Sequence, residues 1–185
     1  MERTDQKMLK RSKMLLCALL LAALALPALA EGATPWIDRV ESLEWFGEGE
    51  NVLKKDEYGL LYDIETGISL RIKRMGGHNH ADVEPATAAD TAKLLQLNGG
   101  KFGWESHACI LYANGRYVTC AINTKPHGQQ TLRDNGYNGQ FCLHMTGSIT
   151  HGSRRVNACH QAAIADACAW AGIQTLSAEA DAKTP

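Results

Sequence analysis

The sequence predicts a mainly β domain with flanking helices, of the α+β class. Apolar Ile68, Leu70 and Ile72 alternate with polar residues, which is the period of a strand with one buried face. Asn114-Gly115 separates two apolar runs, and this dipeptide favours a two-residue hairpin turn. A stripe of small apolar residues near the C-terminus is typical of a helix that packs closely on a sheet.

Residues 1–30 are expected to form a secretory signal peptide. Lys10, Arg11 and Lys13 precede an apolar run at 14–26, and Ala28-Leu29-Ala30 offers a small-residue cleavage site. The run is shorter than the roughly 20 apolar residues of a membrane-spanning helix, so no stable span is expected after cleavage. We therefore expect a secreted protein or one of the cell envelope.

The charge of the exported part argues against nucleic acid as a partner. Removing residues 1–30 takes five of 19 basic and two of 20 acidic side chains, leaving 14 and 18 and a net charge of −4. No basic patch with interleaved aromatic residues is present, so nucleic-acid binding is not expected. About 155 residues remain, enough for one domain with its own core.

The remaining chain divides into a lead-in, one domain and a tail. Residues 31–58 are acidic and rich in turn residues, and we expect them to dock on a single domain at 59–176. The domain begins with a hairpin of segments 60–64 and 68–75. Residues 177–185 are expected to be a disordered tail.

Local signals place the later elements. Thr87 with Asp90 three positions later predicts an N-cap for a helix over 88–97. A hairpin turning at Asn114-Gly115 follows, then a loop rich in glycine and asparagine. A strand is expected at 141–146 and a final helix from about Asn157.

The cysteines suggest one disulfide and one free thiol. Five cysteines follow the leader, and an odd number leaves at least one unpaired in an oxidising compartment. Counting outward from the Asn114-Gly115 turn brings Cys109 opposite Cys120, with Cα atoms about 5.5 Å apart, so a disulfide is predicted there. Cys142 is the candidate free thiol. The alternative, that all five are reduced core residues, stays open.

His127 and Cys142 are the residues best suited to covalent chemistry. A thiol becomes a strong nucleophile when a base produces the thiolate, and imidazole is the commonest such base near neutral pH. In this interpretation Cys142 attacks a carbonyl and His127 carries the proton, while a backbone carbonyl near Gly128 fixes the imidazole tautomer. Backbone N–H groups around Phe141 and Cys142 would receive the oxyanion. The alternative is an ordinary buried strand cysteine and a loop histidine.

The segment from His127-Gly128 to Cys142-Leu143-His144-Met145 resembles the active-site loop and strand of the L,D-transpeptidase (YkuD-like) family. The resemblance implies a β-sandwich or barrel fold, with Cys142 as nucleophile, His127 as base and Gly128 as the glycine that follows it. It implies substrate-binding positions at His144, Asn138 and Gly139. The chain departs from the family pattern at Gln140-Phe141, where the family has His-Gly, and at His144, where it has arginine.

A second resemblance covers residues 63–161, with the segment Gly76-Gly77-His78-Asn79-His80-Ala81-Asp82-Val83-Glu84-Pro85, and is to exported clostridial cell-wall proteins. It points to the cell wall of a bacterium without indicating a reaction. The first resemblance implies an enzyme that acts on peptidoglycan stem peptides as a transpeptidase or carboxypeptidase, with no cofactor.

A zinc site is the main alternative. Histidine and aspartate are zinc ligands, and alternate residues of a strand share a face, so a cluster could form from His78, His80, Asp82, His144 and His151. Such a cluster would make the protein a zinc-dependent cell-wall peptidase using His80, Asp82 and His144 or His151. A third interpretation is a peptidoglycan-binding module without activity.

Overall fold

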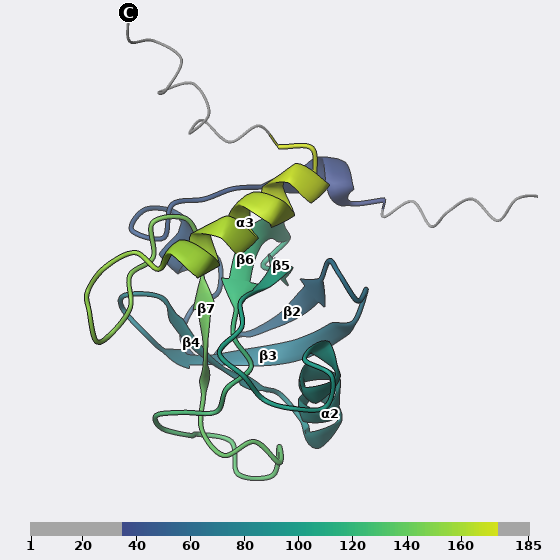
Figure 1. The fold of residues 1–185 in the computed structure, drawn as a ribbon, viewed down its shortest axis with the longest axis vertical. Coiled ribbons are helices and arrows are strands. Elements are labelled where there is room, and N and C mark those ends of the chain that lie inside the picture. The colour runs from purple at the N-terminus through teal and green to yellow at the C-terminus, as the bar shows by residue number, and fades with distance from the viewer. Residues whose placement is uncertain (1–34, 174–185) are drawn as a thin grey trace, which may run out of the picture. The chain divides into compact units, whose positions relative to one another are not determined.

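The computed structural model describes residues 35–173 (Figure 1). The predicted signal peptide (1–30) and tail (177–185) lie outside the described residues. The helical elements are η1 (Ile37–Arg39), η2 (Gly49–Asn51), α2 (Ala88–Leu97) and α3 (Ala158–Trp170). The strands are β1 (Val40–Glu41), β2 (Tyr58–Asp63), β3 (Ser69–Gly76), β4 (Ala81–Pro85), β5 (His107–Ala113), β6 (Arg116–Ile122) and β7 (Phe141–His144).

The strands form one sheet that closes on itself. Their order is β1-β6-β5-β2-β3-β4-β7, and a further pairing of β6 with β7 closes six of them into a barrel, outside which β1 pairs with β6. The pairings within the barrel are antiparallel, whereas β1 lies parallel to β6. The predicted mainly β class with flanking helices, including its barrel form, is confirmed.

The β5–β6 hairpin has the register that its turn predicts. Ala113 pairs with Arg116 and Cys109 with Cys120, because Asn114 and Gly115 both take positive φ, as a two-residue turn requires. The predicted disulfide between Cys109 and Cys120 is nevertheless wrong, since both are free thiols. Burial raises the pKa of both thiols and so suppresses the thiolate that disulfide formation needs.

The short strand β7 joins the two ends of the sheet. On one side Cys142 pairs with Asp82 of β4, and on the other Leu143 pairs with Ile122 of β6. Phe141 and Leu143 belong to the core inside the barrel. Since side chains alternate along a strand, Cys142 and His144 leave β7 on its outer face.

The helices cover different parts of the sheet. Helix α2, capped by Thr87 as expected, packs on β3 and β4, while α3 lies across β5 and β6 (Figure 1). Asn157 caps α3, whose Ala163, Ile164 and Cys168 form a second small core with β6. Neither helix of residues 35–173 has the length and apolar character that a bilayer crossing requires.

Residues 36–57 contribute to the core of the domain, mainly through Trp45 and its contact with Arg74. Trp45 is buried, and the guanidinium of Arg74 lies 4.9 Å from its ring centroid. Four backbone carbonyls accept hydrogen bonds from this guanidinium, at 2.6 to 2.9 Å, from Glu50, Leu53, Gly76 and Gly77. The Arg74 side chain therefore links residues 50–53 of the lead-in to residues 76–77, which precede His80, by hydrogen bonds.

Replacing Arg74 by leucine should lower the free energy of unfolding by at least about 3 kcal/mol, because buried carbonyls lose a charged donor. Chemical denaturation measures this change. The control is Arg71→Leu, since the Arg71 side chain is 62% exposed and its change should stay within about 0.5 kcal/mol. Equal stability of the two variants would contradict the role of Arg74.

Candidate active site

Cys142 lies in the wall of a cavity of about 530 Å³ on the outer face of β7. This volume is in the range of pockets for small molecules and peptide segments. The cavity is lined by His80, Trp104, Asn123, His127, Gly128, Gln140, Cys142, His144, Thr150, His151, Gly152, Asn157 and His160. Most of these side chains are polar, and five of them are imidazoles.

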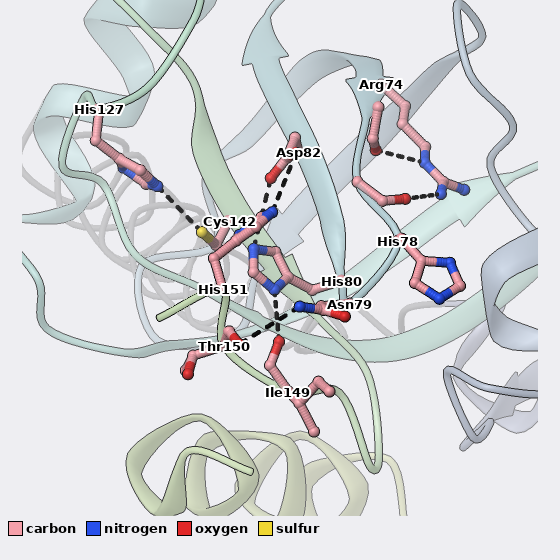
Figure 2. Close-up of polar contacts among 12 residues, drawn as sticks. Arg74, His78, Asn79, His80, Asp82, His127, Cys142, Ile149, Thr150 and His151 are labelled. Carbon is pink, nitrogen blue, oxygen red and sulfur yellow. Dashed lines mark hydrogen bonds and ion pairs between the residues drawn. The ribbon is translucent and has the colours of Figure 1, made fainter. Parts of the chain in front are cut away.

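His127 and Cys142 are in direct contact, with the Nε2 atom 3.2 Å from Sγ (Figure 2). The Nδ1 atom of His127 lies 2.8 Å from the carbonyl oxygen of Lys125, to which it donates in the neutral ring. This hydrogen bond leaves Nε2 free to accept a proton from the thiol. The carbonyl that fixes the tautomer is thus that of Lys125, whereas the sequence suggested one near Gly128.

The backbone of His127 is held by Gln140, two residues before Cys142. The two residues exchange both backbone hydrogen bonds, at 3.0 and 2.8 Å, and this bridge closes the loop between them. Gly139 has φ of +134°, and a Cβ there would come within 2.7 Å of the His127 carbonyl oxygen. Glycine at 139 therefore allows the close approach that sets the imidazole beside the thiol.

The surroundings of Cys142 favour its thiolate. Burial alone would raise the pKa of the thiol, but the hydrogen bonds and charges of His127 and His80 outweigh burial, and the pKa lies below its ordinary value. The hydrogen bond with Cys142 in turn raises the pKa of His127. Both shifts favour a thiolate–imidazolium pair.

His80 approaches Cys142 from the side of β4. Its Nδ1 atom lies 2.8 Å from the Ile149 carbonyl oxygen, and its Nε2 atom lies 3.5 Å from Asp82 Oδ1 (Figure 2). Burial works against a charge on His80, yet Asp82 and Cys142 together raise its pKa to about 10. Residues 78–80 form a bend before His80 reaches the cavity. The bend requires glycine at position 77, where φ is +93° and a Cβ would lie 2.1 Å from the His80 carbonyl oxygen.

Three further histidines lie behind and beside His80. The rings of His144 and His160 are stacked with centroids 4.1 Å apart, and His144 is stacked on His80 at 4.3 Å. Burial and the neighbouring imidazoles lower the pKa of His144 to about 2 and that of His160 to about 4, so both are neutral. His151 is half exposed and meets His80 edge to face, with its Nε2 atom 3.9 Å from Asp82 Oδ2.

Two groups of these side chains could hold a metal ion. Each group has its donor atoms within 4.8 Å of one another: one is His80, Cys142 and His144, and the other is His80, Asp82 and His151. Metal-binding histidines commonly donate their second ring nitrogen to a backbone carbonyl, as His80 does to Ile149. The second group fits a single ion better, because its two imidazole rings are perpendicular, whereas those of His80 and His144 are nearly parallel.

Some of the residues singled out from the sequence lie away from the cavity. His78 is exposed and lies apart from His80, His127 and His151 (Figure 2). Its ring packs against that of Phe46. It does not share a strand face with His80, because β4 begins only at Ala81 and residues 78–80 form a bend. Asn138 is exposed, and neither it nor Gly139 is among the residues that line the cavity.

The cavity also includes residues that no local sequence pattern singles out as site residues, among them Trp104, Asn123 and His160. Trp104 is 61% exposed, and its ring centroid lies 5.0 Å from that of His127, so it forms a wall beside the dyad. Asn123 follows β6, and its neighbour Ile122 pairs with Leu143. Only the pairing of β6 with β7 brings Asn123 to Cys142, and no local pattern predicts that pairing.

The arrangement can therefore carry out nucleophilic catalysis. It combines an activated thiol, an oriented base and a cavity that can accept a substrate. The sequence suggested the backbone N–H groups of Phe141 and Cys142 as an oxyanion site. In the structure these two residues pair with Val83 and Asp82 of β4.

Comparisons of the chain with family models, curated proteins and solved structures found no match.

Proposed function

We propose that this protein is a cysteine-dependent acyltransferase of the L,D-transpeptidase type that acts on peptides. The observation that carries the proposal is the 3.2 Å contact between His127 Nε2 and Cys142 Sγ in the wall of an open cavity. A thiol that serves only to fill a core does not need an oriented imidazole beside it.

The proposed reaction has two halves. The thiolate of Cys142 attacks an amide carbonyl and forms the C–S bond; the C–N bond then breaks, and His127 Nε2 gives its proton to the leaving amine. In the second half an acceptor amine or water loses a proton to Nε2 and bonds to the carbonyl carbon. The C–S bond breaks, and the thiolate is regenerated. An amine acceptor gives transpeptidation, and water gives carboxypeptidase activity.

The substrate class and location rest on the sequence. The resemblance of the segment from His127 to Met145 to L,D-transpeptidases supports peptidoglycan stem peptides as acyl donors. The leader at residues 1–30 supports export, and the cell envelope of a bacterium is where such substrates occur. Trp104 offers an aromatic surface at the cavity on which a peptide could lie.

Formation of an acyl-enzyme tests the proposal. Cys159 is exposed and Cys17 lies outside the described residues, so both are replaced by alanine in the full chain to leave Cys142 as the accessible thiol. Incubation with a synthetic stem tetrapeptide should add the mass of the peptide minus its leaving amino acid, and digestion should place the adduct on Cys142. Binding of the peptide without any adduct would favour the peptidoglycan-binding module.

A zinc-dependent peptidase is the second candidate, favoured by the group His80, Asp82 and His151. These residues would hold the ion through two imidazole nitrogens and a carboxylate. Bound zinc would supply an activated water and polarise the peptide carbonyl. In this alternative Cys142 would not form a covalent intermediate.

Chelation separates the two candidates. For the acyltransferase we expect treatment with EDTA and dialysis to leave peptide turnover within about twofold, because the reaction uses no metal. For the zinc peptidase, turnover should fall at least about 10²-fold and return with added Zn²⁺. Metal content of the purified protein, measured before and after chelation, provides the control. Loss and recovery of turnover with zinc would overturn the acyltransferase.

A further inference from the structure

Asn123 directly follows β6 and lies beside Cys142 of β7. Ile122 and Leu143 pair across β6 and β7, and continuing that register by one residue places Asn123 opposite Cys142. Since Ile122 and Leu143 point into the barrel core, Asn123 and Cys142 leave the sheet on its other face. Both line the cavity.

The carboxamide of Asn123 is buried and incompletely bonded. The residue is only 3% exposed, and its Oδ1 atom has no hydrogen-bond partner among residues 35–173. An unpaired buried acceptor destabilises a fold, so its presence calls for a reason. The Nδ1 atom of His144, another residue that lines the cavity, likewise has no hydrogen-bond partner among the described residues.

Two other asparagines of the domain show the contrast. Asn157 also lines the cavity, but its Oδ1 atom accepts from the backbone N–H groups of Cys159 and His160 and caps α3. Asn135 is as buried as Asn123, yet its amide donates to the Pro85 carbonyl and its Oδ1 accepts from Tyr137 N–H. Of these three side chains, that of Asn123 is therefore the one whose amide oxygen has no partner among residues 35–173.

We propose that Asn123 is a substrate-binding residue whose Oδ1 accepts a hydrogen bond from a backbone N–H of the acyl-donor peptide. The proposal rests on the proposed function for the identity of the donor. It assigns the ligand chemistry: a secondary amide whose N–H lies close to the carbonyl that Cys142 attacks. Both ring nitrogens of His127 are already engaged, by the Lys125 carbonyl and by Cys142, so His127 cannot supply this acceptor.

Binding to an inactive protein tests the inference without turnover. The full chain with Cys142→Ala is titrated calorimetrically with two synthetic stem tetrapeptides. The two peptides differ by one methyl group on a backbone nitrogen. This nitrogen belongs to the residue whose carbonyl Cys142 would attack. The titrations are repeated after adding Asn123→Leu, which keeps the size of the side chain and removes its acceptor.

We expect the methyl group to weaken binding about tenfold when Asn123 is present and less than about twofold when leucine replaces it. A methyl effect of equal size in both proteins would overturn the inference, as would failure of the unmethylated peptide to bind. Failure of the proposed function looks different. The peptide would then bind with the expected methyl effect while the protein with Cys142 intact forms no acyl-enzyme.

Stability provides a second readout that guards against misfolding. Asn123→Leu should raise the melting temperature, because it removes an unpaired buried acceptor. The matched variant Asn135→Leu should lower it, because two hydrogen bonds are lost. A fall of similar size for both variants would mean that Asn123 is structural, and it would contradict a role reserved for a ligand.

Discussion

Replacing Cys142 by serine should abolish acyl-enzyme formation and reduce kcat/KM for a stem peptide at least about 10⁴-fold. The serine hydroxyl has nearly the same shape, but at neutral pH it lacks the thiolate that His127 and His80 favour at this position. Mass spectrometry of the acyl-enzyme and steady-state kinetics measure the two effects. Because the change is nearly isosteric, the fold should persist, and its melting curve checks this.

The control for Cys142→Ser is another buried thiol. Cys168→Ala on α3 removes a sulfur that packs against β6 and lies 3.6 Å from Thr119 Oγ1, far from any proposed chemistry. It should cost stability and leave kcat/KM within about twofold. A Cys142→Ser protein that still turns over peptide at the original rate would rule out covalent catalysis at this thiol and direct attention to the zinc alternative.

Replacing His127 by glutamine should lower kcat/KM by about 10²- to 10⁴-fold, the usual contribution of general acid–base catalysis. Glutamine fills a similar space but cannot carry a proton between the thiol and the leaving amine. Alkylation of Cys142 by iodoacetamide at pH 7 should slow as well, because one of the two imidazoles that lower the thiol pKa is gone. Kinetics on the peptide and the alkylation rate provide independent measurements.

Two comparisons make the His127 result specific. Gln129→Ala changes an exposed residue of the same loop and should leave both rates within about twofold. His80→Gln removes the other imidazole beside Cys142, whose Nε2 is turned to Asp82. If His80→Gln abolished turnover while His127→Gln retained it, the base would be His80, and the assignment of His127 would be wrong.

Short-range signals in the chain are enough to predict the local elements of the fold. Turn chemistry at Asn114-Gly115 set the β5–β6 register, and the caps at Thr87 and Asn157 set where α2 and α3 begin. Such signals act over a few residues, so they can be recognised without knowing the rest of the fold. The same register counting placed Cys109 opposite Cys120 but could not show that burial keeps both as thiols.

The surroundings of Cys142 depend instead on strand pairings between distant parts of the chain. His127 could be suspected because it precedes Cys142 by a short loop, but His80, Asp82 and Asn123 come to the thiol through the pairing of β7 with β4 and β6. Barrel closure joins strands that are distant along the chain, and its registers depend on how all six strands pack together. His78 does not line the cavity, because residues 78–80 bend before β4 begins.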